Sequence, residues 1–258
     1  MNPQNVKKIF DHQSYYLAPA VFESKQLERM TDSFNQIASA LSNNEQANNA
    51  RWSGAQMDAL DGGESVVLHT HNIQNYSGVW TQAFMSEHFL DIAEKILGPD
   101  IVLHHSKLFL KPPETGAPFP MHQDWEHFPS QQDKMIAAVI HLTDTDEESG
   151  CLRIYPGSHT AGRLDGMKGE GEGSKARPEY TLQGATPVPA KAGDVLFFSY
   201  LAVHGSTTNT SKVPRKTVLV QLHPGDDRVE SGNRHTNLKL ALRGRNHFAS
   251  RHVMGSIR

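Results

Sequence analysis

The pattern of apolar residues changes at Gly98–Pro99, and this change constrains the fold more than any other feature. Before it, apolar residues recur at helical spacing over residues 22–41 and 86–97, where Ser86 suits an N-cap and Gly98 a C-cap. After it, short segments rich in β-branched and apolar residues alternate with turn residues. These segments are residues 101–110, 135–143, 151–155, 195–199 and 217–223. This order predicts a mainly β protein, a closed or double-sheet β-core with helices packed outside.

With 258 residues, the chain is long enough for one domain with a large buried core. We therefore expect a single domain over residues 1–258, with a helical part to residue 98 and the β-core over 99–223. The polar stretch 43–63 reads as loop. The glycine-rich, charged stretch 157–190 is long for a loop in a compact domain, so we interpret it as a substrate lid or a mobile surface insertion.

A basic segment over residues 224–258 completes the expected organisation. From residue 231 onward it contains six Arg or Lys and no acidic residue. A solvated tail or a subunit contact is the favoured interpretation, and a contribution to binding an anionic substrate is the other.

Composition argues against several classes of protein. The formal net charge of −3 does not favour a dedicated nucleic-acid binder. No apolar run approaches the length that spans a membrane, and the N-terminal residues do not resemble a signal peptide. The single cysteine, Cys151, excludes an internal disulfide and fits a reducing compartment, so we expect a cytoplasmic protein. Its oligomeric state, monomer or homodimer, stays open.

Three residues suggest a metal site. His122 and Asp124 are two apart, so on a β-strand their side chains point the same way. His204, just after residues 195–199, supplies a second imidazole. Two imidazoles and one carboxylate on one face of a metal form the facial triad of non-haem Fe(II) oxygenases. A zinc hydrolase uses similar donors and remains an alternative, although zinc chemistry does not by itself call for Arg215.

Arg215 supplies what a dicarboxylate cosubstrate needs. It lies eleven residues past His204 and leads into the strand-like segment 217–223. A carboxylate left unpaired in an apolar barrel is very costly, so a permanently charged fork donor is expected beside it. Ser206, two residues beyond His204, is placed to donate a second hydrogen bond to the same carboxylate. Together with the triad, these residues predict an Fe(II) dioxygenase that uses 2-oxoglutarate.

Three stretches resemble the phytanoyl-CoA dioxygenase family. The first runs from KPPETG at residues 111–116 to MHQDWEHFP at 121–129, and the second is ESGCLRIYPGSH at 148–159. The third is His204-Gly-Ser206 with Arg215 at the family's spacing. The resemblance covers about residues 100–222 at the level of motifs.

The resemblance implies a double-stranded β-helix (jelly-roll, cupin-like) core, with Fe(II) as metal, 2-oxoglutarate as cosubstrate and O2 as oxidant. The implied reaction is C–H hydroxylation with release of succinate and carbon dioxide. Carried onto this chain, the catalytic iron ligands are His122, Asp124 and His204. Arg215 and Ser206 hold the 2-oxoglutarate carboxylate, and Gln123 lies beside the cofactor.

Two departures limit the transfer of a substrate. Where relatives often have a tryptophan after the HxD motif, this chain reads Ala-Ala-Val-Ile-His over residues 137–141. Where a glutamine often precedes the family's serine, this chain has His105 before Ser106. Because Asp124 is present, halogenation is disfavoured, since halogenating relatives replace that carboxylate.

The substrate is predicted from one strand face. In residues 105–111, period two places His105, Lys107, Phe109 and Lys111 together, and inward and outward orientations of this face are equally compatible with the sequence. If the face is inward, Lys107 and His105 are candidate substrate-binding residues for a small anionic or zwitterionic metabolite.

The leading specific substrate is 2-aminoethylphosphonate, because the chain is similar to bacterial family members that hydroxylate it. Hydroxylation of a CoA thioester or a secondary metabolite is an alternative. A cupin-like protein that binds metal and 2-oxoglutarate without catalysis is another.

Overall fold

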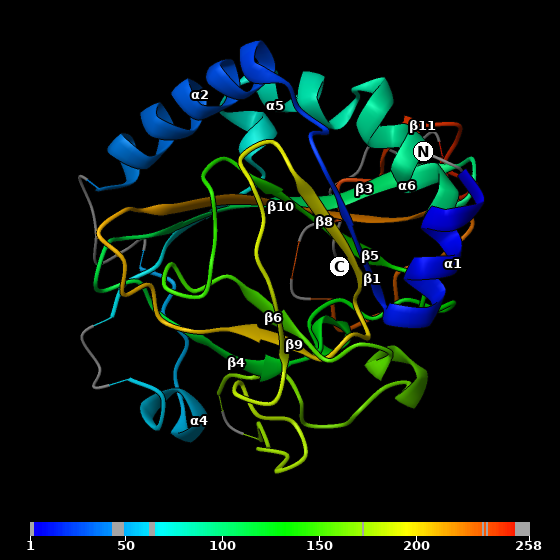
Figure 1. Cartoon of the computed structure of the whole chain (residues 1–258). Helices are drawn as coiled ribbons and strands as arrows, with labels where there is room; N and C mark the ends of the chain where they lie inside the picture. The colour runs from blue at the N-terminus through cyan, green and yellow to red at the C-terminus, as the bar shows by residue number, and fades with distance from the viewer. Residues whose placement is uncertain are drawn as a thin grey trace.

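Two antiparallel sheets face each other and form a jelly-roll core (Figure 1). This computed structural model describes residues 3–42, 49–61, 65–171, 173–233, 235 and 237–250. The large sheet has the order β1-β8-β5-β10-β3-β11, with β2 also paired to β3, and the small sheet has the order β4-β9-β6-β7. The large sheet comprises β1 (Tyr15–Ala18), β2 (Leu68–His71), β3 (Ile101–Lys111), β5 (Ile136–His141), β8 (Val195–Ser199), β10 (Arg215–Pro224) and β11 (Leu240–Arg243). The small sheet comprises β4 (Phe119–His122), β6 (Leu152–Ile154), β7 (Thr186–Val188) and β9 (His204–Ser206).

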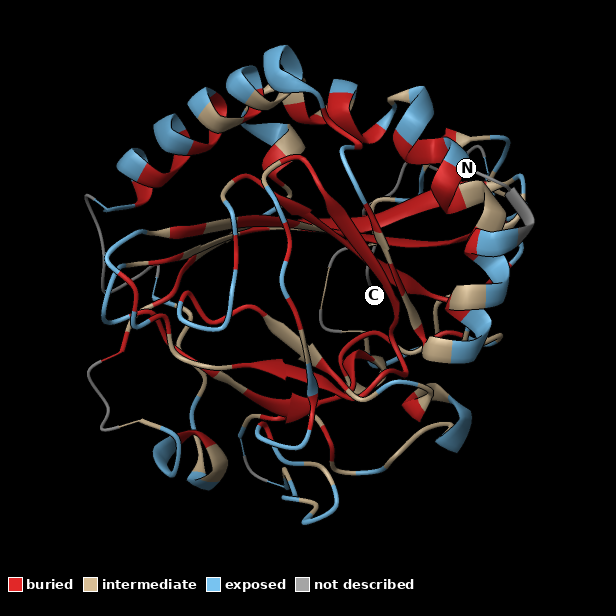
Figure 2. Ribbon diagram, in the orientation of Figure 1, coloured by how far each residue is buried: buried red, intermediate tan, exposed pale blue. Residues whose placement is uncertain are grey.

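Helices cover the outer face of the large sheet and turn their buried sides toward it (Figure 2). The main helices are α1 (Pro3–Gln13), α2 (Ser24–Ser42), α5 (Gly78–Phe84) and α6 (Glu87–Leu97), and α4 (Ala55–Asp58) is a single turn near β4. Three 3-10 turns complete the described elements: η1 (Ile73–Asn75), η2 (Asp124–Glu126) and η3 (Ser158–Ala161). In the described part of the chain, no helix combines the length and apolar character that a bilayer crossing needs.

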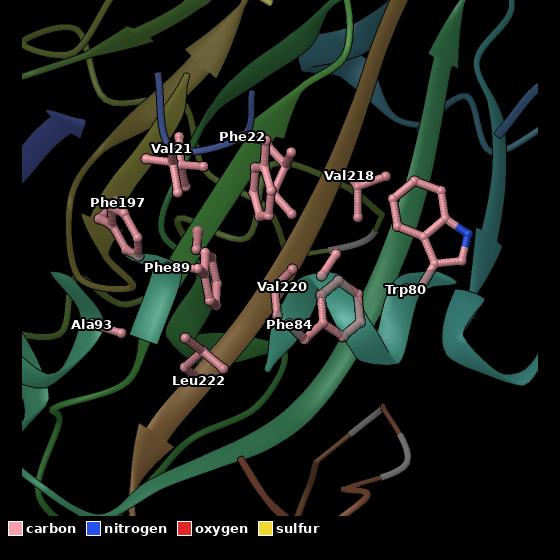
Figure 3. Close-up of a cluster of buried hydrophobic side chains, with 14 of the residues drawn as sticks. Val21, Phe22, Trp80, Phe84, Phe89, Ala93, Phe197, Val218, Val220 and Leu222 are labelled. Carbon is pink, nitrogen blue, oxygen red and sulfur yellow. The ribbon is translucent and has the colours of Figure 1, made fainter. Parts of the chain in front are cut away.

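The central strand β10 is buried on both faces because its side chains alternate between two cores. Val218, Val220 and Leu222 point toward the helices and join a cluster with aromatic residues of α5 and α6 (Figure 3). The alternate residues Thr217 and Leu219 point in the opposite direction, into the space between the two sheets, where they line a cavity. The helix layer therefore supports the sheet from behind and leaves its inner face available for a site.

A bulge in β3 brings two neighbouring histidines to the same side. The register along β10 passes from His105 directly to Leu103, so His104 is an extra residue in β3. The rings of His104 and His105 both lie against Phe128, at centroid distances of 5.6 and 5.2 Å. Beyond the bulge, the face that carries Lys107 points inward, which decides the question that the sequence left open.

Most long elements agree with the sequence predictions, but α1, which has 11 residues like α6, was not predicted. The helices predicted over 22–41 and 86–97 appear as α2 and α6, and the five predicted strands appear as β3, β5, β6, β8 and β10 with ends shifted by a few residues. Gly98 ends α6 with φ 97° and donates its amide to the Glu94 carbonyl at 2.8 Å. Ser86 occupies the N-cap position, but its hydroxyl makes no capping hydrogen bond.

Short elements were missed. Strands β1, β2, β4, β7, β9 and β11 have only three or four residues each, too few to show a period-two pattern. The stretch 43–63 was read as loop and contains α4, while residues 43–48 and 62–63 lie outside the described residues. Of the basic segment, β11 pairs with β3, and residues 251–258 lie outside the described residues.

The contact between α6 and the sheet should dominate the stability of the helix layer. Phe89 is fully buried, with ring centroids 6.2 Å from Phe22 and 5.6 Å from Phe197. We expect Phe89→Ala to lower the free energy of unfolding by about 3–5 kcal/mol, because it removes apolar contacts and leaves a cavity. Urea unfolding measures the change. Met85→Ala, on a side chain that is 47% exposed, is the matched control, and an equal loss in both variants would contradict this packing role.

Candidate metal centre

Pairing between β4 and β9 brings two histidines together that are far apart in the sequence. The antiparallel register places His122 directly opposite His204, and their ring centroids are 4.1 Å apart. Directly opposite residues on an antiparallel pair have adjacent side chains, so the short strands alone create this proximity. Both histidines are buried.

Asp124 joins them by a route that differs from the sequence prediction. The expectation that His122 and Asp124 share one strand is wrong, because β4 ends at His122 and Asp124 begins the 3-10 turn η2. Two backbone hydrogen bonds fix this transition, from the Gln123 amide to the Met167 carbonyl at 2.8 Å and from the Asp124 amide to the Tyr200 carbonyl at 3.0 Å. The Asp124 carboxylate nevertheless reaches the same point as the two imidazoles.

The hydrogen bonds of the two rings assign their tautomers. His122 Nδ1 lies 2.7 Å from the Pro120 carbonyl and His204 Nδ1 lies 2.9 Å from the Ala202 carbonyl. A carbonyl only accepts, so each Nδ1 carries the proton and each Nε2 of the neutral ring presents a lone pair. Burial, together with the neighbouring His204, lowers the pKa of His122 well below its usual value, which favours the neutral ring.

Three atoms that can act as metal ligands therefore converge. Asp124 Oδ1 lies 3.7 Å from His122 Nε2 and 3.8 Å from His204 Nε2, and Asp124 Oδ2 is buried without a hydrogen-bond partner among the described residues. One ligand atom from each residue lies within 4.8 Å of the other two. Backbone carbonyls that accept a hydrogen bond from the other ring nitrogen are typical of metal-binding histidines, and two His with one Asp is a donor set that suits Fe(II).

Aromatic rings hold the imidazoles in place. Trp52 packs edge-on against His122 at 4.6 Å between centroids, and Phe198 lies 4.5 Å from His204. The loop predicted as a lid approaches here as well. A Cβ added to Gly169, whose φ is +77°, would lie 2.4 Å from the Trp52 ring and 3.0 Å from His122 Cβ. Part of the stretch 157–190 thus covers the metal centre, and its action as a lid stays a prediction.

Beside the triad lies an elongated space that we call the Arg215 cavity. Its volume is about 580 Å³ including its opening to solvent. It is lined by Trp52, Lys107, Phe109, Phe119, His122, Asp124, Val139, Leu152, Phe198, His204, Gly205, Arg215, Thr217 and Leu219. The walls are mostly apolar, and Arg215 is buried with its Nε unpartnered while Nη1 donates to the Gly150 carbonyl. Burial lowers the pKa of Arg215 to about 10, as expected for a cation that lacks an anion.

Ser206 and Gln123, the other residues predicted to hold the cosubstrate, differ in what they contact. Ser206 is fully buried at the opposite end of β9 from His204, where its hydroxyl contacts Lys111 Nζ at 2.7 Å. The Gln123 amide is fully engaged with loop groups. It donates to the Leu201 and Gly162 carbonyls and accepts from Trp125 Nε1 and the Leu164 amide. A hydrogen bond from Gln123 to a cosubstrate would require breaking one of these.

A second space adjoins the first, and we call it the histidine chamber. It is lined by Ala50, Arg51, Trp52, His69, His71, Lys107, Phe109, Asp124, His127, Glu170 and His235. Four of these residues also line the Arg215 cavity, so the two spaces meet next to Asp124. Burial followed by the charge of Lys107 lowers the pKa values of His69, His71 and His235, the second of these to about 4.

Lys107 lines both the chamber and the Arg215 cavity. Its Nζ lies 3.3 Å from His235 Nε2 and 5.7 Å from the centroid of the Phe128 ring. Burial lowers its pKa to about 8, against the opposing effects of Asp124 and Glu170. His105, also predicted to bind substrate, lines neither space; its ring stacks on His235 at 4.6 Å and its Nδ1 lies 2.6 Å from His104 Nδ1. His105 therefore supports the chamber wall from behind.

Sequence reasoning missed several lining residues. Trp52 follows a polar stretch, His69 and His71 lie on a four-residue strand, and His235 lies in the basic segment. Neither periodicity nor motif marks these positions. The high count of histidines was the one available signal, and it could not say which of them meet.

The phytanoyl-CoA dioxygenase (PhyH) family model matches residues 10–217. The chain belongs to this family. Among curated relatives, a probable alpha-ketoglutarate-dependent hypophosphite dioxygenase from Stutzerimonas stutzeri is 32% identical over 142 residues, which are 52% of this chain and 49% of the relative. Ectoine dioxygenase from Bordetella parapertussis is 32% identical over 149 residues, 50% of this chain and 48% of the relative. The chain thus spans about half the length of these curated relatives.

Solved structures share the fold at low sequence identity. The epimerase SnoN, in complex with Fe3+, alpha ketoglutarate and nogalamycin RO, aligns with a TM-score of 0.73 at 20% identity, covering 89% of this chain and 86% of SnoN. EctD from S. alaskensis in its apoform aligns with a TM-score of 0.71 at 18% identity, covering 96% and 86%. The jelly-roll core predicted from the sequence and from the family resemblance is confirmed.

Metal binding should depend on each ligand of the triad. We expect His122→Ala to abolish stoichiometric binding of Fe(II) or Mn(II), because two remaining donors cannot hold a face of the ion. Anaerobic equilibrium dialysis with metal analysis measures the occupancy. His88→Ala, at an exposed position on α6, is the control and should bind as the unaltered protein does. Full occupancy in His122→Ala would mean that the metal lies elsewhere.

Proposed function

We propose that this protein is an Fe(II)- and 2-oxoglutarate-dependent dioxygenase that hydroxylates a C–H bond of a small anionic or zwitterionic metabolite. One observation carries the proposal: three ligand atoms converge beside a cavity that contains a buried guanidinium without an anionic partner among the described side chains. The triad calls for a divalent cation, and Arg215 calls for a carboxylate. A zinc hydrolase would explain the triad, but it would not explain the buried Arg215.

Each part of the site has a task in this reaction. Fe(II), 2-oxoglutarate and O2 together supply the oxidising chemistry when bound. Arg215 binds the distal carboxylate of the cosubstrate and so sets its position along the cavity. Apolar wall residues such as Val139, Leu152 and Leu219 exclude water from the space between Arg215 and the triad. The packed rings of Trp52 and Phe198 hold the imidazoles at the angle that the ion requires.

The histidine chamber supports a substrate that carries an anionic group. Lys107 supplies a half-buried positive charge, and the imidazoles of His71 and His235 supply further polar contacts. Glu170 lines the same chamber and provides a carboxylate for a substrate ammonium group. A short zwitterion with an oxyanion at one end fits this charge pattern, and 2-aminoethylphosphonate is our specific proposal. The relative named as a hypophosphite dioxygenase supports a phosphorus oxyanion.

Other metabolites compete with this choice. Relatives named phytanoyl-CoA dioxygenase support a CoA thioester, and SnoN with nogalamycin RO supports a secondary metabolite. An uncharged hydrophobic substrate would cover the half-buried Lys107 ammonium without giving it an anion, which disfavours such a substrate. The single cysteine, which is buried, agrees with a reducing compartment, and we propose a cytoplasmic location.

Arg215 should control affinity for the cosubstrate. We expect Arg215→Ala to weaken 2-oxoglutarate binding by about 2–5 kcal/mol, because the carboxylate loses its buried charged partner. An anaerobic Fe(II)/2-oxoglutarate absorption titration measures the dissociation constant. Arg228→Ala is the control, since that side chain packs over Phe248 and lines neither space. Unchanged affinity in Arg215→Ala would refute the assignment of this base.

Lys107 should control affinity for the substrate. A panel of 2-aminoethylphosphonate, other phosphonates, CoA thioesters and uncharged compounds is screened for succinate formation with Fe(II), 2-oxoglutarate and O2. We expect coupled turnover with the aminophosphonate, and Lys107→Met to raise its KM at least about tenfold because a charge-assisted contact is lost. The 2-oxoglutarate affinity should change far less. Metal and cosubstrate binding without any coupled substrate would favour a non-catalytic binding protein instead.

A further inference from the structure

Two buried cations face each other at one end of the inner surface of the large sheet. Lys111 is directly opposite Arg215 in the antiparallel register of β3 and β10. Lys111 is fully buried and Arg215 is 5% exposed. Among the described side chains, neither forms an ion pair with a carboxylate. Like charges directly opposite in a sheet are destabilising, and burial without an anion adds to the cost.

The contacts of Lys111 lead to the small sheet. Its Nζ lies 2.7 Å from Ser206 Oγ and 2.9 Å from the Thr207 carbonyl oxygen, and it sits 5.1 Å from the centroid of the Phe119 ring. An ammonium group has donors only, so Ser206 Oγ accepts this hydrogen bond. The proton of the Ser206 hydroxyl is then directed elsewhere and is free to be donated.

The spacing along β9 fits a short dicarboxylate. Ser206 and the metal ligand His204 are two residues apart on this strand, about 6.6–6.8 Å. A five-carbon dicarboxylate with one end at the metal reaches a comparable distance. Arg215 lines the same cavity as His204 and would meet the other end.

We propose that Lys111 is a positioning residue for the distal carboxylate of 2-oxoglutarate. It turns the Ser206 hydroxyl into a donor toward that carboxylate and adds a second positive charge, which the carboxylate offsets together with that of Arg215. This inference rests on the proposed function, because it takes 2-oxoglutarate as the occupant of the cavity. Lys111 thus has a role in cosubstrate binding although it is not proposed to contact the metal or the substrate.

Removing Lys111 should have opposite effects on the stability of the cosubstrate-free protein and on the binding of 2-oxoglutarate. In the cosubstrate-free protein, loss of its charge removes repulsion from Arg215, so the melting temperature should stay equal or rise. In the complex, loss of the same charge should weaken binding. A lysine with only a structural task would lower the melting temperature and leave cosubstrate affinity unchanged.

The experiment compares Lys111→Met with the unaltered protein, using Mn(II) in place of Fe(II) so that no turnover occurs. Calorimetric titration with 2-oxoglutarate should give a dissociation constant about 10- to 100-fold weaker in the variant. The rise in melting temperature that saturating 2-oxoglutarate produces should shrink accordingly. Lys134→Met, at an exposed lysine, is the matched control and should match the unaltered protein in both measurements.

A second variant keeps the test decisive if Lys111→Met does not fold. Ser206→Ala removes only a hydroxyl, and it should also weaken 2-oxoglutarate binding. Wild-type affinity in either folded variant overturns the inference, as does a lowered melting temperature with unchanged affinity. Failure of the proposed function is distinct, because the unaltered protein would then show no 2-oxoglutarate binding with Mn(II) at all.

Discussion

Uncompensated charge organises the centre of this molecule. Two imidazoles and a carboxylate direct potential metal-ligand atoms to one point. Nearby, the side chains of Arg215 and Lys111 are buried, and no carboxylate among the described residues forms an ion pair with either. A protein that folds around such groups gives up stability, and the compensation comes from a cation at the first point and an anion at the second. The triad requires a positive charge, and the Arg215–Lys111 pair requires a negative one. A metal ion and a carboxylate cosubstrate supply these two opposite charges at neighbouring positions.

The remaining architecture makes this arrangement rigid. The helix layer packs on even-numbered positions of β10, while odd-numbered positions, from Arg215 to Leu219, form the inner wall. The β4–β9 pair is short, yet its register alone sets His122 opposite His204. The carbonyls of Pro120 and Ala202 then accept hydrogen bonds from the Nδ1 atoms of His122 and His204. In a longer, more regular strand these carbonyls would pair with a neighbouring strand instead.

In the proposed function, the histidine chamber binds the substrate and the Arg215 cavity binds the cosubstrate. Lys107 and Arg215 lie on the paired strands β3 and β10. Lys107 lines both the histidine chamber and the Arg215 cavity, whereas Arg215 lines only the cavity. A bulge at His104 shifts the alternation of β3, so that His104 and His105 both stand behind this wall. The family's shared motifs cover the triad and Arg215, and they include the chamber residues Asp124 and His127. The chamber residues His69, His71, Lys107 and His235 lie outside those motifs.

The sequence by itself determined the fold class, the triad and Arg215. Strand-like segments and the spacing of motif residues can be read from the order of the amino acids alone. It did not determine which face of β3 points inward, since period two is symmetric until a partner strand and a helix layer are present. It placed Asp124 on a strand, whereas backbone contacts from Met167 and Tyr200 turn the chain into a 3-10 turn. The meeting of His71, Lys107 and His235 depends on strand pairing between distant segments, and only the tertiary structure decides such contacts.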